Sequence, residues 1–189
     1  MPLAVTLRLD AEGAAPIEAL WRGLAEAGVD DDCLRLGYPP HLTLGIWSEE
    51  AAPTAVLEAA MLRLAEEWPA LPVAFSGLGV FPGTPALLYA APVPNAALLA
   101  CHTALAAALP GMDCYPHYRP GHWVPHATLG QTASAARAVE VLLPLWPGPM
   151  RGRLDRLELV RFRPVEVLRS LALRAAPLAG RSDGAALPR

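Results

Sequence analysis

The chain has 189 residues, 53% of them hydrophobic and 17% charged, which is the balance of a folded globular protein with one domain or two small lobes. Its formal net charge is −3, and all 15 basic residues are arginine. No apolar run approaches the length of a membrane-spanning helix, which is about 20 residues. This composition excludes a membrane-spanning protein and disfavours stable binding of long nucleic acid, which needs a broad basic surface. The odd count of 3 cysteines and an N-terminus without a signal-peptide pattern favour the reducing cytoplasm.

The first half of the chain predicts five elements in alternation. They are a strand over 2–9, a helix over 16–27, a strand over 41–47, a helix over 53–67 and a strand over 73–81. In the first helix, apolar residues recur at spacings of three and four, Pro16 suits the first turn and Gly28 suits the stop. The last strand contains two glycines, Gly77 and Gly79, which loosen it.

The second half repeats this order and adds one strand. It predicts a strand over 86–91, a helix over 95–109 capped by Asn95, an irregular stretch over 112–121, a strand over 123–131, a helix over 134–143 and a hairpin of 154–162 with 167–174. Residues 175–189 are small and polar and predict a disordered tail. We therefore expect one two-lobed domain over 1–174, with a first repeat over 2–82 and a second over 85–174.

The strongest evidence for the repeat is one short sequence motif, which occurs at the same place in each half. Residues 40–45 read Pro-His-Leu-Thr-Leu-Gly and residues 125–130 read Pro-His-Ala-Thr-Leu-Gly, so five of the six positions match. In a strand, side chains alternate between faces, so His41 shares one face with Thr43, as His126 does with Thr128. The leucines and Ile46 would take the apolar face, and Gly45 and Gly130 would leave space for a ligand on the polar one.

This arrangement favours phosphodiester chemistry. If the two strands are adjacent and face each other across a groove, a phosphate fits between two imidazoles and two hydroxyls. Hydrolysis needs one base and one acid on opposite sides of phosphorus, and histidine fills either role at neutral pH. Threonine hydroxyls donate hydrogen bonds to the non-bridging oxygens. The rate is expected to be bell-shaped in pH, with both limbs near neutrality.

A duplicated His-x-Thr motif, with its histidines 85 residues apart, resembles the 2H phosphoesterase superfamily, which includes 2′-5′ RNA ligase-like proteins and cyclic nucleotide phosphodiesterases. The resemblance covers residues 2–174. It implies an α+β fold of two pseudo-twofold-related lobes, with antiparallel sheets flanking a central groove and helices outside. It also implies catalysis without a metal, by His41 and His126, with Thr43 and Thr128 on the phosphate. RNA-handling relatives carry arginines after each motif, where this chain has Gly45 and Gln131.

The stretch between the second helix and the second motif offers further candidates. Tyr118 and Trp123 could stack on a base, and Arg119 could reach a phosphate, although an ordinary packed loop explains the same residues. Cys114 and the histidines at 117, 122 and 126 match no common zinc spacing, so we predict no metal and no other cofactor. Five arginines between residues 151 and 163 are interpreted as solvated positions of the closing hairpin.

These observations predict a cytoplasmic, metal-independent enzyme that hydrolyses 2′,3′-cyclic phosphates of nucleotides or short RNA ends. The expected partner is a small nucleotide or an RNA end, with no membrane and no stable complex with long nucleic acid. Three alternatives stay open: a 2′-5′ RNA ligase or 2′-5′ phosphodiesterase, a 3′-5′ trimming nuclease, and a nucleotide-binding module without turnover. The oligomeric state does not follow from the sequence.

Overall fold

The computed structural model describes residues 1–175, and its elements alternate along the chain as predicted. In order they are β1 (Pro2–Leu9), α1 (Ala11–Glu26), α2 (Asp32–Leu36), β2 (His41–Ser48), α3 (Thr54–Glu67), β3 (Leu71–Phe81), β4 (Ala86–Pro92), α4 (Ala96–Ala108), the 3₁₀ helix η1 (Pro116–Tyr118), β5 (Ala127–Thr132), α5 (Ala135–Leu145), β6 (Met150–Arg161) and β7 (Glu166–Ala172). Over these residues, no helix combines the length and apolar character needed to cross a bilayer. The predicted tail lies, from residue 176 onward, outside the described residues.

The strands form one antiparallel sheet with the order β2-β1-β6-β3-β4-β5, and β7 pairs with β6 beside this path. Exchanging β1 with β4, β2 with β5 and β3 with β6 reproduces the same order read backwards, which is the pseudo-twofold relation that the sequence predicts. The two half-sheets are continuous because β6 pairs with β1 over most of its length and with β3 at its start. Among the described strands, β7 is the one without a counterpart.

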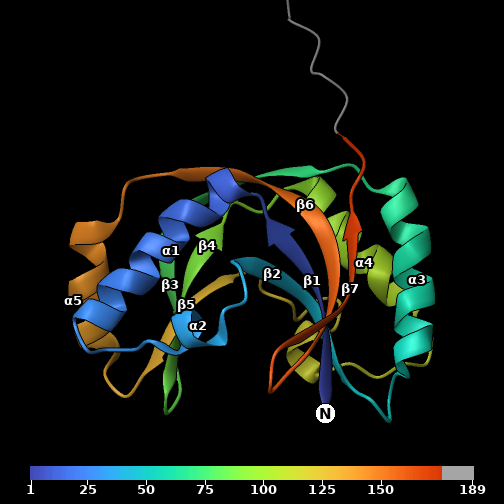
Figure 1. Ribbon diagram of the computed structural model, residues 1–189, viewed down its shortest axis with the longest axis horizontal. Coiled ribbons are helices and arrows are strands. Elements are labelled where there is room, and N and C mark those ends of the chain that lie inside the picture. Colours follow the sequence, from blue (N-terminus) through green and yellow to red (C-terminus); the bar gives the residue numbers. More distant parts are fainter. Residues whose placement is uncertain (176–189) are drawn as a thin grey trace, which may run out of the picture.

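Helices cover the outer sides of the sheet and leave its inner surface to the centre of the molecule. Figure 1 shows α1 and α5 on one side, beside β3, β4 and β5, and α3 and α4 on the other, beside β1, β6 and β7. The apolar faces of helices and strands form one continuous core of buried side chains, which includes Leu7, Ile17, Leu42, Met61 and Phe75. This core supports the rigid strands that carry the two motifs.

Two helical segments depart from the prediction. Helix α1 begins at Ala11 rather than at Pro16, because the Asp10 carboxylate accepts a hydrogen bond from the Gly13 amide at 2.9 Å and caps the helix there. Pro16 therefore lies inside the helix. The short helix α2 has no apolar periodicity and no fully buried residue, so the hydrophobic pattern gave no sign of it.

Both motif strands contain a β-bulge at the same place. Along β1, Thr6 pairs with Thr43 and Val5 pairs with Gly45, so Leu44 is the extra residue. Along β4, Tyr89 pairs with Thr128 and Leu88 pairs with Gly130, which makes Leu129 the extra residue of β5. A bulge reverses the alternation of faces beyond it. The expected faces of Gly45 and Ile46 are therefore wrong, as the site itself shows.

Candidate functional site

A cleft with a volume of about 310 Å³ lies between the two halves and is lined by all four predicted motif residues, His41, Thr43, His126 and Thr128. The motif strands were expected to be adjacent in the sheet, but they lie at the two ends of the strand path. The sheet curves so that these end strands approach each other across the cleft. The symmetry of the strand order thus brings two identical pairs of side chains to one place.

The two histidines make the same hydrogen bond within their own motif. Nδ1 of His41 lies 2.8 Å from the Pro39 carbonyl oxygen, and Nδ1 of His126 lies 2.8 Å from that of Val124. A carbonyl only accepts, so each Nδ1 carries the proton and the neutral ring presents Nε2 as the free nitrogen. In each motif, the carbonyl of the residue two positions before the histidine therefore fixes the tautomer of its imidazole.

Burial makes both imidazoles hard to protonate in the empty cleft. It lowers the pKa of His41 to about 4, a shift opposed by the Pro39 carbonyl and by the charge of Glu158. Burial also lowers the pKa of His126, opposed by its bond to Val124, while nearby His117 adds to the lowering. Both rings are therefore neutral at pH 7 and able to accept a proton.

Two tryptophans hold the motif strands in position. Trp21 of α1 donates from Nε1 to the Thr128 carbonyl at 2.9 Å, and Trp123 donates in the same way to the Thr43 carbonyl at 2.9 Å. Strands at the ends of a sheet leave backbone groups unpaired, and these donors satisfy one such carbonyl in each motif. The backbone of both phosphate-binding candidates is fixed by the same device.

Of the two motif glycines, which were expected to leave space for a ligand, only Gly130 lines the cleft. A Cβ at Gly45 would lie 2.3 Å from the Trp47 ring, and one at Gly130 would lie 2.7 Å from a carboxylate oxygen of Asp30. Both glycines are needed for packing behind the bulges. The residues that follow them, Ile46 and Gln131, line the cleft, together with Gly130 but without Gly45.

The three substrate-contacting candidates in the loop before β5 lie in different surroundings. Tyr118 is buried, lines the cleft, and has a pKa raised to about 12 by burial, against the effect of the nearby Thr43 hydroxyl. Trp123 stacks one face on His102 at a centroid distance of 4.2 Å, which makes His102 a packed residue of α4. Arg119 is not among the residues that line the cleft and pairs with Asp113 at 2.7 Å.

Beyond His126 a second, largely aromatic pocket of about 340 Å³ continues from the cleft, and the two share Leu87, Tyr118 and His126 as common walls. Its other lining residues are Phe81, His117, His122, Trp123 and Val124. The second motif therefore lies between two spaces, a cleft lined in part by charged side chains and a pocket lined mostly by aromatic rings.

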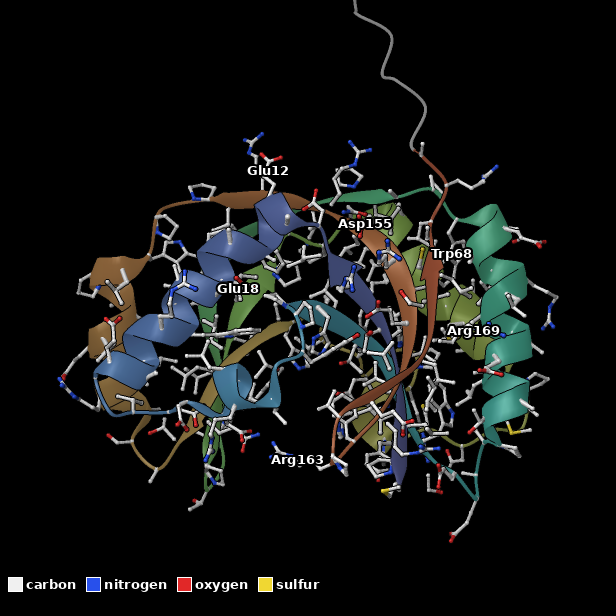
Figure 2. All side chains as sticks on the ribbon, viewed as in Figure 1. Glu12, Glu18, Trp68, Asp155, Arg163 and Arg169 are labelled. Atoms are coloured by element: carbon white, nitrogen blue, oxygen red, sulfur yellow. The ribbon has the colours of Figure 1, made fainter. Side chains whose placement is uncertain are left out.

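Sequence reasoning missed Arg163, which is the one cation among the described residues that line the cleft. Figure 2 shows it extending from the turn between β6 and β7 toward α2, where its guanidinium pairs with both carboxylate oxygens of Asp32. This pair lowers the pKa of Asp32. Its place in a run of five arginines gave no reason to single it out, because only the fold brings it to the cleft.

Sequence reasoning also missed the groups behind the histidines. Tyr38 packs its ring against His41 at a centroid distance of 4.7 Å, and buried Glu158 bonds to Tyr38. Phe81 and Tyr89 pack against His126 at 5.1 and 5.6 Å. Except for Tyr38, these residues are remote in sequence from the histidine they serve, and none of them belongs to the repeated six-residue string. In residues 1–175, no three histidine, cysteine or carboxylate side chains gather into a group that could hold a metal ion.

Comparison with known proteins gives a consistent result. A family model described as the 2′-5′ RNA ligase superfamily matches residues 39–166, which contain both motifs. No curated protein matches the sequence. Among solved structures, TT0787 of Thermus thermophilus is similar with a TM-score of 0.63 and 22% identity, covering 93% of this chain and 99% of that one.

Two further structures share the fold. E. coli LigT complexed with NADP+ has a TM-score of 0.59 and 20% identity, covering 91% of this chain and 96% of that one. Usb1 of Kluyveromyces marxianus has a TM-score of 0.50 and 17% identity, covering 91% and 98%. The α+β fold expected from the resemblance to 2H phosphoesterases is confirmed.

Proposed function

Because the chain belongs to the 2′-5′ RNA ligase superfamily, we propose that it is an enzyme that hydrolyses 2′,3′-cyclic phosphates of nucleotides or short RNA ends. One observation carries the proposal: two neutral imidazoles of the same tautomer and two threonines line a single cleft. Phosphodiester hydrolysis needs one proton acceptor and one proton donor around one phosphate, and the duplicated motif places an imidazole in each of the two positions, one of which must be protonated to act as the donor.

In this reaction, water attacks phosphorus and one of the bonds from phosphorus to a ribose oxygen breaks. One histidine takes a proton from the water at Nε2, and the other, protonated at Nε2, gives its proton to the departing ribose oxygen. The product is a nucleoside monophosphate with a free neighbouring hydroxyl, and the two histidines have exchanged protonation states. Thr43 and Thr128 donate hydrogen bonds to the non-bridging oxygens as their charge increases.

The pocket beside His126 supports a nucleotide as the substrate. Its rings offer a nucleobase a stacking surface, and base–aromatic stacking contributes about 1–3 kcal/mol per base in single-strand recognition. Tyr118 forms a wall of both spaces, and Trp123 keeps one ring face for this pocket while the other face stacks on His102. We therefore retain Tyr118 and Trp123 as base-contacting candidates and exclude Arg119, which lies outside both spaces.

A panel of substrates tests the proposal. Purified protein is incubated with the four nucleoside 2′,3′-cyclic phosphates and with 2′-5′- and 3′-5′-linked dinucleotides, with and without a metal chelator, and products are separated chromatographically. We expect turnover of cyclic phosphates that the chelator does not reduce. Binding without turnover of any substrate would instead identify a nucleotide-binding module.

One observation favours a second candidate, a 2′-5′ phosphodiesterase or ligase. A cyclic phosphate has one nucleoside, whereas the motif lies between two spaces that could each hold one. Faster cleavage of the 2′-5′ dinucleotide than of any cyclic phosphate would favour this candidate, and shortening of 3′-5′-linked RNA from its end would favour a trimming nuclease.

A further inference from the structure

The two halves carry the same histidine and threonine but differ in the strands behind them. In the first half, Thr43 pairs with Thr6, which pairs in turn with Glu158, and Glu158 pairs with Ser170 of β7. In the second half, the corresponding row of paired residues runs from Thr128 to Tyr89 and then to Gly79. Gly79 has no side chain, and the Tyr89 ring occupies the space where its Cβ would lie. The row behind one motif is therefore ionic, and the row behind the other is aromatic.

Glu158 is a buried carboxylate with a complete set of partners. It is 1% exposed, and it accepts hydrogen bonds from Arg8 at 3.1 Å, from Tyr38 at 2.8 Å and from Ser170 at 2.6 Å. Burying an ionised carboxylate is costly unless charge and hydrogen bonds compensate, and these three donors do so. Its place behind the first motif is therefore fixed by side chains from β1, from the segment before β2 and from β7.

Tyr38 connects this carboxylate to the cleft. Its hydroxyl bonds to Glu158 and to Thr6, at 2.8 and 2.7 Å, so the phenol is fixed at its far end. Burial raises the pKa of Tyr38, so the hydroxyl stays protonated and able to donate. Its ring packs on His41, three residues further along the chain, with the ring planes tilted by 53°. The position of the His41 ring is therefore set by Pro39 on one side and by Tyr38 on another.

The reaction requires His41 to carry a proton at one stage, whichever role it has. As the base it becomes an imidazolium after attack, and as the acid it is an imidazolium beforehand. Burial disfavours that form, and the negative charge of Glu158 opposes the effect of burial on the pKa of His41. The groups that face His41 are Glu158 with its partner Arg8 from the strands behind, Tyr38 from the preceding segment, and His126 across the cleft.

We propose that Glu158 and Tyr38 are positioning residues for His41: Tyr38 orients its ring, and the buried carboxylate stabilises its protonated form. The inference rests on the proposed function for its catalytic meaning, but its physical content concerns one histidine and holds without any substrate. The second half has no carboxylate in the corresponding row, so His126 receives no such support. The two histidines thus present the same nitrogen to the phosphate, but the protein groups behind them differ.

Titration by NMR tests this directly, with His126 as a control inside the same molecule. The pKa values of both histidines are measured from their ring ¹⁵N and ¹³C shifts in the unmodified protein and in Glu158→Gln, which keeps the shape and removes the charge. We expect the pKa of His41 to fall by about 0.5 to 1 pH unit, less than the roughly 1–3 pH units of a directly contacting charge. The pKa of His126 should not change. An unchanged His41, or equal changes at both histidines, would overturn the proposal.

A second pair of variants guards against a Glu158→Gln protein that does not fold. Tyr38→Phe keeps the ring on His41 but removes the bond to Glu158, and Tyr89→Phe makes the same change beside His126. Only the first should change the pKa of His41 and shift the limb of the kcat/KM profile that His41 governs. Equal effects of the two variants would show a merely structural role. If the protein turns over no substrate but the pKa of His41 still changes in the variant while that of His126 does not, the proposed function is contradicted and this inference stands.

Discussion

At the scale of single residues, the two motif histidines form one catalytic unit, because each proton that one accepts must be matched by a proton that the other donates. His41→Ala and His126→Ala should each lower kcat by about 10²–10⁴-fold, which is the usual contribution of a positioned acid or base. The double variant should be little slower than either single variant. Steady-state rates on the best substrate, with thermal unfolding to check the fold, measure this. Losses that multiply would instead indicate two independent binding contacts.

The pH dependence follows from burial of both rings. The pKa of His41 is about 4, and that of His126 is also below its usual value. The profile of kcat/KM reports the free enzyme, so it should be bell-shaped with its centre below about 6.5, the ordinary pKa of histidine. This replaces the expectation of limbs near neutrality. The profile of kcat should lie at higher pH, because a bound phosphate anion favours the imidazolium. A kcat/KM optimum above pH 7 would contradict it.

Stability should change with pH for the same reason. The unfolded chain protonates His41 near the ordinary value of about 6.5, whereas the folded protein does so only near pH 4. The unfolded state therefore binds more protons in between, and the free energy of unfolding should decrease as pH falls from 6.5 toward 4. His41→Gln should make that decrease smaller, as measured by urea denaturation at several pH values. An identical slope in both proteins would show that other groups cause it.

Among single residues, the repeat made the four motif residues predictable, whereas most of the residues that support them were missed. His41 and Thr43 were found because the same string recurs 85 residues later. Tyr38, Glu158 and Arg163 gave no signal, because their significance depends on neighbours far away in the chain: Glu158 meets Tyr38 across 120 positions, and Arg163 meets Asp32 across 131. Burial of a carboxylate cannot be inferred from its identity, since most are exposed.

At the scale of elements, the bulges in β2 and β5 determine which residues reach the cleft. Each bulge turns the residue after the glycine inward, so Ile46 and Gln131 line the cleft and Trp47 enters the core. The alternation of apolar and polar residues predicted the strands themselves but could not show an inserted residue, because Leu44 and Leu129 fit a regular strand equally well.

The bulge in β2 can be tested by its glycine. Gly45→Ala places a methyl group 2.3 Å from the buried Trp47 ring, and overpacking of this kind costs about 1–3 kcal/mol of unfolding free energy. Gly77→Ala in β3 is the matched control, since nothing lies within 4 Å of its added Cβ and its effect should be near zero. Denaturant unfolding of the two variants gives the comparison. Equal stabilities would show that β2 relaxes around the extra atom.

At the scale of the whole molecule, the order of elements followed from the sequence, but their arrangement did not. Hydrophobic periodicity and caps such as Asn95 predicted most helices and strands, and the repeat predicted the twofold relation. That the motif strands lie at opposite ends of one sheet depends on long-range pairing of β6 with both β1 and β3, which no local pattern encodes.

The distribution of charge over the molecule favours a small substrate. Of the five arginines between residues 151 and 163, only Arg163 lines the cleft, and Arg161 pairs with Glu49 and Glu166. Few phosphates are neutralised together, so KM for a cyclic mononucleotide should change only a few-fold between about 50 and 200 mM salt.

A short RNA with the same cyclic end should have a similar kcat/KM. Initial rates over a salt series, for substrates of one to about ten nucleotides, measure both quantities. A steep salt dependence together with preference for long RNA would show that the arginines of β6 act as a track.

Strand β7 has a consequence that reaches beyond its place in the sheet. A pair of identical imidazoles related by a twofold axis has no direction: water could attack from either side with equal ease. The reaction does have direction, because water enters at one end and a sugar oxygen leaves at the other. This strand, which the first half of the chain does not repeat, adds Ser170 beside Glu158 and so helps to distinguish the first histidine from the second. A duplicated protein can acquire a preferred course of reaction in this way, by adding to one half and leaving the repeated groups untouched.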